Sequence, residues 1–465
     1  MAGDLNTEAG ALSDALAAFA LDARWEDLPE PVRHEARRCL VNYFACALAG
    51  WRDPAVRTAA RVFERIGPAG ACSVIGTPDT EAPLHAASLN AMSANVFDYD
   101  DTHLPTILHP TAPVAAAAFA LAQLQPTSGR ELLQAVVAGI EVACRIACAV
   151  SPEHYARGWH ITGTCGVFGA AAAASRLLRL DRQQGVWAFG AASAQASGLV
   201  ETLGTMAKSL GVGNAAANGL LSAWLAQEGF AGPAAPLEGA RGFLPVFGTG
   251  LRPQALLGAL GERWEILANT YKPYPCGVVL NPVIEACLHL RPQLALEAIE
   301  RIERIELEAH PLLRQRTDRP GVASGKASQV SAQHAVAVAL LRGRAGLDEF
   351  SDEAVADPAL RALGSRLVFV EDATMGVEAA EVRVLLRDGR RFAHRVAAAH
   401  GSLQSPLTDD ELSAKCEALA RHGGSGVDAR PLLEALWQLD RLPDAALALR
   451  LAQPANANNP SWSNK

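Results

Sequence analysis

The sequence has no excess of positive charge, and this limits its possible partners. Its 465 residues include 41 Lys and Arg against 49 Asp and Glu, which gives a net charge of -8, and it has no basic run. Binding a nucleic-acid backbone requires a cationic stripe, so we do not expect nucleic acid as a partner. A small anion can still bind where a few Lys, Arg or His side chains gather in one cleft.

The chain also lacks a convincing membrane span, a secretory signal and paired cysteines. Residues 104–129 form the longest stretch without a formal charge, but prolines interrupt it repeatedly. The first ten residues are acidic and small, unlike the basic and then apolar pattern of a secretory signal. The nine cysteines form no CxxC pair, so we expect a cytoplasmic protein without a membrane partner and with reduced thiols.

What is present is a large apolar fraction with helical periodicity. At 50% hydrophobic and 19% charged residues, the chain can bury a large core, and its length favours two domains. From about Leu12 to Leu267 the sequence is rich in Ala, Leu and Gly, and strand-like alternation is nearly absent. The pattern predicts closely packed helices over residues 112–124, 131–150, 166–180 and 214–228.

The composition changes after Leu267. Residues 302–307 alternate like a strand, and residues 378–396 predict a hairpin around Asp388-Gly389. Helical spacing returns after Thr408, which indicates that the C-terminal segment rejoins the first domain. We predict a mainly α protein with a large all-helical domain over 1–267 and 403–454, a smaller α+β lid domain over 268–402, and a disordered tail over 455–465.

Two segments in the helical region carry side chains suited to catalysis. Residues 95–110, NVFDYDDTHLPTILHP, crowd three acids and two imidazoles in front of an apolar helix, where they are costly unless paired or used. Alternatives are a helix cap with a solvated acidic turn, or metal ligation, although the spacing fits no ligand pattern. Residues 158–170, GWHITGTCGVFGA, place His160 before a glycine-rich helix start that favours a carboxylate, although such glycines also suit tight packing.

Two further segments contain isolated lysines. Lys208 is the only charge between Glu201 and Glu228, so it either reaches water or is retained to meet an anion. In residues 271–282, YKPYPCGVVLNP, the prolines enforce an extended path that fixes the directions of Lys272 and Tyr274, unless the segment is only a linker. Cys276 has no identifiable base nearby, so we interpret it as structural.

Taken in this order, the segments resemble the MmgE/PrpD family, which includes 2-methylcitrate dehydratase, cis-aconitate decarboxylase and iminodisuccinate epimerase. The resemblance extends through GLLSAWLAQEGFAGP, LEGARGF and PLTDDELSAK, and so covers nearly the whole chain. It implies a helical domain built from both chain ends, a lid domain, a homodimer, and neither an iron–sulfur cluster nor any other cofactor.

The resemblance also implies roles for individual residues. Asp98, Thr102 and His109 fall on the family's Asp, Thr and His positions, with one extra residue between Asp and His, while His160, Lys208 and Lys272 match its second His and its two Lys positions. We predict a catalytic set of Asp98, His109, His160 and Lys272, a substrate-binding set of Thr102, His103, Lys208, Tyr274 and His334, and no metal. The lysines would bind carboxylates, and either His109 or His160 would transfer the proton.

Departures from the family pattern bear on the substrate. Gly277, Val278 and Asn281 stand where many relatives carry Cys, Arg and His, and His334 stands in place of a Tyr. An Asn cannot transfer a proton as a His does, and a Val cannot clamp a carboxylate. These changes argue against 2-methylcitrate itself.

The leading hypothesis is a hydro-lyase that dehydrates a hydroxylated di- or tricarboxylic acid resembling 2-methylcitrate, as in propionate catabolism, by α-proton abstraction and loss of water. The same scaffold suits decarboxylation of a cis-aconitate-like acid or epimerisation at an α-carbon. A non-catalytic helical binding protein is the alternative from another class.

Overall fold

The computed structural model describes residues 10–68 and 70–454, so the predicted disordered tail lies outside the described residues. The chain divides into two compact units. The helical unit contains residues up to Val96, Asp100–Asn269 and residues from Asp409 onward, and the mixed unit contains Phe97–Tyr99 and Thr270–Thr408. The composition change near Leu267 therefore falls within a few residues of a unit boundary.

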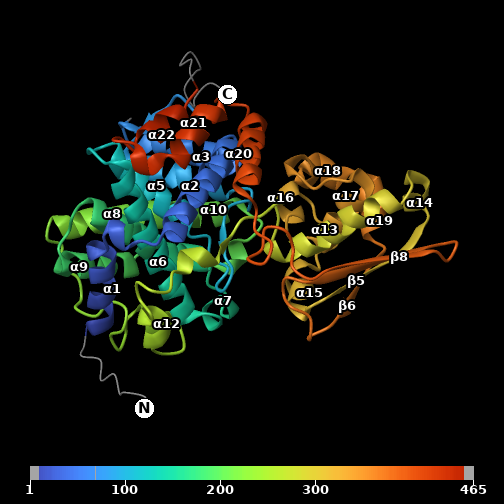
Figure 1. The fold of residues 1–465 in the computed structure, drawn as a ribbon, viewed down its shortest axis with the longest axis horizontal. Helices are drawn as coiled ribbons and strands as arrows, with labels where there is room; N and C mark the ends of the chain where they lie inside the picture. The colour runs from blue at the N-terminus through green and yellow to red at the C-terminus, as the bar shows by residue number, and fades with distance from the viewer. Residues whose placement is uncertain (1–9, 69, 455–465) are drawn as a thin grey trace. The chain divides into compact units, whose positions relative to one another are not determined.

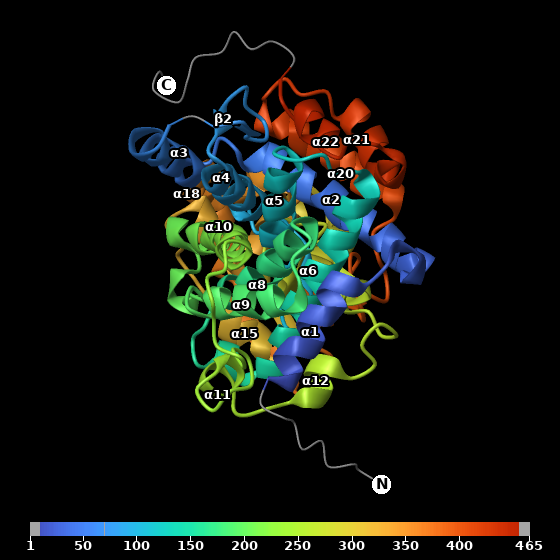
Figure 2. The ribbon, with the colours of Figure 1, turned by 90° about the vertical axis from the view of Figure 1, so that its left-hand side faces the viewer.

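The helical unit is built from both ends of the chain, as Figures 1 and 2 show. Its longer helices are α1 (Ala11–Asp22), α2 (Glu30–Gly50), α3 (Pro54–Ile66), α4 (Pro83–Asn95), α5 (Thr111–Ala122), α6 (Gly129–Val150), α8 (Ile161–Leu177), α9 (Arg182–Ser193), α10 (Met206–Gln227), α20 (Asp409–Gly423) and α21 (Ala429–Trp437). The shorter ones are α7 (Glu153–Ala156), α11 (Phe243–Phe247), α12 (Pro253–Leu257) and α22 (Leu447–Leu451). The four helices predicted from the Ala-rich segments are thereby confirmed as α5, α6, α8 and α10.

The prediction of an all-helical domain needs one correction. β1 (Cys72–Ser73) and β2 (Thr80–Glu81) pair antiparallel within the helical unit, and β3 (Thr102–His103) precedes α5. Two-residue strands are too short to produce a visible alternation in the sequence. A further strand, β4 (Asn269–Thr270), lies where the chain passes from the helical unit to the mixed unit.

Small residues bring the central helices close together. A Cβ on Gly139 of α6 would lie 2.6 Å from the carbonyl oxygen of Gly169 on α8, and a Cβ on Gly169 would lie 2.6 Å from that of Gly139. Since a real side-chain carbon does not approach an oxygen so closely, only glycine permits this backbone contact. α8 packs in turn against α10 and α5.

Helix α6 is long and apolar enough to cross a membrane by length and composition, but 89% of its most apolar window is buried inside the structure. Ser128 and Glu131 form a capping box at its start. α6 therefore behaves as a core helix, and its two buried charges, Glu141 and Arg145, need partners inside the protein.

The mixed unit contains a four-stranded sheet in the order β6-β5-β7-β8. Its strands are β5 (Ile302–Ala309), β6 (Leu367–Glu371), β7 (Ala380–Leu386) and β8 (Arg391–Val396), and its helices are α13 (Asn281–Leu290), α14 (Leu296–Glu300), α15 (Pro311–Thr317), α16 (Gly325–Ser328), α17 (Ala332–Arg342), α18 (Asp352–Ala356) and α19 (Pro358–Gly364). β7 and β8 form the predicted antiparallel hairpin, turning at Gly389 with a φ of 86°. α13 packs on β7 and β8 and against α17 (Figure 1), which buries the apolar face of the sheet.

Candidate active site

His109 lies in the helical unit, in the irregular segment between β3 and α5. Its Nδ1 donates a hydrogen bond to the carbonyl oxygen of Asp101 at 2.7 Å, and its backbone N–H donates to Thr162 Oγ1 at 3.1 Å. Thr102 Oγ1 is 3.5 Å from the same Nδ1. Because Nδ1 carries the hydrogen in this arrangement, neutral His109 has its lone pair on Nε2, the nitrogen suited to proton transfer.

Two buried aspartates support this segment. The Asp100 carboxylate accepts a hydrogen bond from Asn95 Nδ2 at 2.7 Å, and its Oδ1 is 3.4 Å from His109 Nδ1. Asp101 Oδ2 accepts from Thr111 Oγ1 at 2.6 Å and from Asn269 Nδ2 at 2.8 Å, and burial raises the pKa of Asp101 to about 7. Both side chains are buried, so the alternative of a solvated acidic turn does not apply here.

His160 is the N-cap residue of α8, and its backbone N–H donates to the carbonyl oxygen of Gly198 at 3.0 Å. Thr162, which accepts the hydrogen bond from His109, is in the first turn of the same helix. The structure thus brings the segments of both predicted histidines to the N-terminus of α8. A helix N-terminus favours a carboxylate, which is consistent with an anionic ligand at this place.

Lys208 is in the first turn of α10, which begins after the N-cap Thr205 and packs against α8. Only 9% of Lys208 is exposed, so the structure disfavours the alternative in which the side chain extends to water. Its location is consistent with the predicted role in anion binding.

His103 makes contacts that favour a structural role over the predicted substrate contact. Its Nδ1 is 2.8 Å from Thr106 Oγ1 and its Nε2 is 3.2 Å from Glu265 Oε2, and the residue is fully buried. Both ring nitrogens are therefore engaged by neighbouring side chains in the helical unit.

The mixed unit holds Asp98 and Lys272 together. Lys272 Nζ donates to the carbonyl oxygen of Asp98 at 2.8 Å and lies 3.1 Å from its carboxylate Oδ1. Asp98 has a φ of 51°, in the left-handed region, and the neighbouring Tyr99 hydroxyl donates to the carbonyl oxygen of Pro273 at 2.7 Å. Within this unit the carboxylate of Asp98 pairs with the buried Lys272.

The other predicted residues of the mixed unit occupy varied environments. Tyr274 is half-buried, and burial raises its pKa. His334 Nε2 donates to the carbonyl oxygen of Glu349 at 2.7 Å, and burial lowers the pKa of His334, which favours the neutral ring. Burial raises the pKa of Cys276, whose thiol is 3.8 Å from Asn281 Oδ1, consistent with a structural cysteine.

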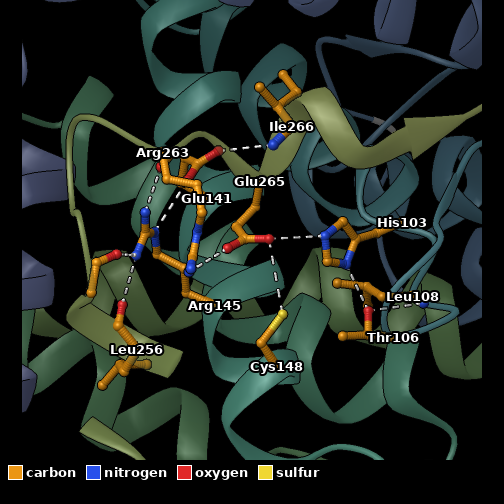
Figure 3. Close-up of polar contacts among 11 residues, drawn as sticks. His103, Thr106, Leu108, Glu141, Arg145, Cys148, Leu256, Arg263, Glu265 and Ile266 are labelled. Carbon is orange, nitrogen blue, oxygen red and sulfur yellow. Dashed lines mark hydrogen bonds and ion pairs between the residues drawn. The ribbon is translucent and has the colours of Figure 1, made fainter. Parts of the chain in front are cut away.

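Three buried charges in the helical unit, shown in Figure 3, are absent from the residues predicted from the sequence. Glu141 and Arg145 pair along α6 at 3.2 Å, and Glu265 contacts His103. Burial raises the pKa of Glu141 to about 7, while Arg145 opposes that shift. The available signal was the pair of opposite charges, four residues apart, in an otherwise apolar helical segment.

His103, Cys148 and Glu265 have donor atoms within 4.8 Å of one another, so by donor type they could hold a metal ion. However, the Glu265 carboxylate is already paired with His103 and, at 2.8 Å, with Arg263. Burial also raises the pKa of the Cys148 thiol to about 12, which disfavours the thiolate that a metal requires. These contacts favour a structural network.

Comparison with known proteins agrees with the motifs. Residues 14–255 match the MmgE/PrpD N-terminal domain, and residues 274–440 match the MmgE/PrpD C-terminal domain. The chain belongs to the MmgE/PrpD family. This confirms the resemblance that the motifs indicated.

Several relatives align over most of their length. The chain is 29% identical to the cis-aconitate decarboxylase-like protein oryM of Aspergillus oryzae, over 96% of this chain and 95% of that protein. It is 27% identical to cis-aconitate decarboxylase of Aspergillus terreus, over 96% of this chain and 97% of that protein. It is 28% identical to the Homo sapiens enzyme of the same name, over 84% of this chain and 85% of that protein. Family and relatives together support an enzyme of the lyase class, whereas the 2-methylcitrate dehydratase assignment receives no specific support.

Proposed function

We propose that the protein is a cofactor-independent carboxy-lyase that decarboxylates cis-aconitate or a closely similar unsaturated tricarboxylate. The observation that carries the proposal is the fixed position of His109, held by Asp101 and Thr162 at the N-terminus of α8 next to His160. Relatives named as cis-aconitate decarboxylases over nearly the whole chain add the substrate class.

The proposed chemistry requires a cationic environment and one proton donor. The bond between carbon and the departing carboxylate breaks, carbon dioxide leaves, and its electron pair remains on the carbon skeleton, delocalised through the double bond. His109 or His160, as an imidazolium, then delivers a proton to carbon, so one proton is taken up for each carbon dioxide released. The buried Lys208 and the N-terminus of α8 would bind the remaining carboxylates.

The family resemblance also assigns Lys272 to the reaction, and within the mixed unit Asp98 holds this lysine in place through its carboxylate and its carbonyl oxygen. A lysine fixed by two contacts loses less conformational freedom when it meets an anion. Variants in each unit therefore test whether both groups of residues serve the same reaction.

The dehydratase hypothesis from the sequence remains the second candidate, because the same histidines suit α-proton abstraction and loss of water. It predicts alkene formation from 2-methylcitrate or citrate without carbon dioxide release. The decarboxylase predicts carbon dioxide release from cis-aconitate.

The decisive experiment incubates the purified protein in deuterated water with cis-aconitate, citrate and 2-methylcitrate and follows all products by NMR. Carbon dioxide release from cis-aconitate, lost in His109→Gln and His160→Gln, would support the proposal. The matched control is His34→Gln, because the His34 side chain is 41% exposed and pairs with Asp409 at the surface. Binding without any turnover would favour the non-catalytic alternative.

We also propose that the protein is a cytoplasmic homodimer, as the family resemblance implies. Sedimentation velocity at several concentrations tests this state. A single species at the monomer mass would contradict it.

A further inference from the structure

The segment that carries Thr102 and His109 has little regular structure. It contains only the two-residue strand β3, an isolated bridge between His103 and Leu108, and Ile107 in the left-handed region with a φ of 57°. The segment's own backbone hydrogen bonds are few: the His103 N–H donates to the carbonyl oxygen of Leu108 at 2.8 Å, and the carbonyl oxygen of Asp101 accepts from His109 Nδ1 at 2.7 Å. Contacts from outside the segment therefore add to the support of His109.

His103 is the central contact of the segment, as Figure 3 shows. Its Nδ1 meets Thr106 Oγ1 at 2.8 Å, and the same oxygen is 3.4 Å from the backbone nitrogen of Leu108, the residue before His109. On the other side its Nε2 meets Glu265 Oε2 at 3.2 Å. The His103 ring therefore connects Glu265, through Thr106, to the backbone next to His109.

Glu265 is itself fixed by the core of the helical unit. Arg145, fully buried on α6, donates to the carbonyl oxygens of Leu256 and Gly258, each at 3.1 Å, and to that of Arg263 at 2.6 Å. Glu141 pairs with Arg145 and accepts the backbone N–H of Ile266 at 2.9 Å. These bonds fasten the chain on both sides of Glu265 to one rigid helix (Figure 3).

A local contact adds to this connection. The backbone N–H of Leu104 donates to the carbonyl oxygen of Ala268 at 3.2 Å, so the segment around Glu265 also supports the backbone after β3. The hydrogen bond from His103 lowers the pKa of the Glu265 carboxyl, as expected for an ionised acceptor.

We infer that Glu265 is a positioning residue for His109, acting through His103 and Thr106 on a support that Arg145 and Glu141 hold rigid. Only the expected effect on the reaction rate rests on the proposed function, whereas the positioning of His109 does not. A displacement of about 1 Å at a proton-transfer group lowers the rate on the order of 100-fold, even when the change lies away from the reacting atoms.

The test compares Glu265→Ala with Glu265→Gln, whose amide oxygen can still accept the His103 N–H. We expect Ala to lower kcat by about 10-fold or more with KM changed less than about threefold, because an orienting contact is lost while the anion-binding groups remain. Gln should restore kcat to within about threefold of the wild type. His34→Gln is the control, because the His34 side chain is 41% exposed and pairs with Asp409 away from this network, so both constants should stay unchanged.

A second readout does not depend on turnover. Histidine-selective labelling gives ring NMR signals for the 12 histidines, and His109→Gln assigns the His109 signal. We expect this signal to shift in Glu265→Ala and in Thr106→Val, which interrupts the connection at its other end, and to stay near its wild-type position in Glu265→Gln. The His34 signal should be constant throughout.

An unchanged His109 signal in both Glu265→Ala and Thr106→Val would overturn the inference. So would an unchanged kcat in Glu265→Ala. A third contrary outcome is that Glu265→Gln loses as much kcat and as much melting temperature as Glu265→Ala does. If Glu265→Ala does not fold, Thr106→Val decides by the same signal. If the wild type turns over none of the acids, the proposed function fails, while the His109 signal still decides this inference.

Discussion

Replacement of Asp101 by Asn should remove much of the pH dependence of the stability of the helical unit. Asp101 is buried and accepts hydrogen bonds from Thr111 and Asn269 through one oxygen, and burial raises its pKa from 3.8 to about 7. An Asn amide oxygen can accept the same two hydrogen bonds but does not ionise between pH 5 and pH 8.

The pH dependence of stability that Asp101 causes follows from the difference between its pKa values in the folded and unfolded states. A group whose pKa is higher in the folded state contributes stability that is present below its unfolded pKa and lost as the pH rises through the folded value. With the pKa rising from 3.8 to about 7, Asp101 costs the wild type about 2 to 3 kcal/mol between pH 5 and pH 8. Glu141 titrates in the same range but is present in both proteins, so its contribution cancels in the comparison.

The assay is urea unfolding followed by helical circular dichroism at pH 5, 6, 7 and 8, extrapolated to water. Between pH 5 and pH 8 the free energy of unfolding should decrease in both proteins. The decrease should be smaller in Asp101→Asn than in the wild type by about 2 to 3 kcal/mol. Asp22→Asn is the control, because the Asp22 side chain is 60% exposed and should change the pH dependence little. Parallel curves for wild type and Asp101→Asn, within about 1 kcal/mol, would refute the reasoning.

Three other predictions test the core and the candidate site. Arg145→Met should lower the free energy of unfolding by about 3–5 kcal/mol in urea titrations, because Glu141 loses its buried partner, and adding Glu141→Gln should recover part of the loss. Gly139→Ala should lower it by about 1–3 kcal/mol, since the new Cβ meets the Gly169 carbonyl oxygen, and an unchanged melting temperature would contradict that contact. Lys272→Met should lower kcat/KM for cis-aconitate on the order of 100-fold in initial-rate assays while the fold is retained, and full activity would remove Lys272 from the candidate site.

The fold could be predicted from the sequence where one periodicity persisted over many residues. The apolar spacing over 131–150 predicted α6, and the alternation around Asp388-Gly389 predicted the β7–β8 hairpin. β6 escaped prediction although it pairs in parallel with β5, because its exposures do not alternate cleanly and its partner is more than fifty residues away. A parallel pairing leaves no local turn signal in the sequence.

The candidate site was predictable only in part. The motif around Thr102 and His109 could be identified because many ionisable groups occur in a short segment. Glu265 could not be identified, because its partner His103 is 162 residues away and nothing local distinguishes a paired glutamate from a solvated one. The predicted substrate contact of His334 stays a prediction, and what the structure adds is the hydrogen bond from His334 Nε2 to the carbonyl oxygen of Glu349.

The geometry separates the supporting residues from the ligand-binding residues by the kinetic constant that each should change. Glu265 would act on His109 through His103 and Thr106, so a change in Glu265 should alter the position of His109 but not the cations that the substrate meets. Lys208 is buried and is proposed to bind a carboxylate, so its loss should weaken ground-state binding as well as the transition state. If Glu265→Ala mainly lowers kcat while Lys208→Met mainly raises KM, proton delivery and anion binding are separate functions of the helical unit. If both variants raise KM equally, the buried network around Glu265 instead shapes the binding pocket, and positioning His109 is not its main role.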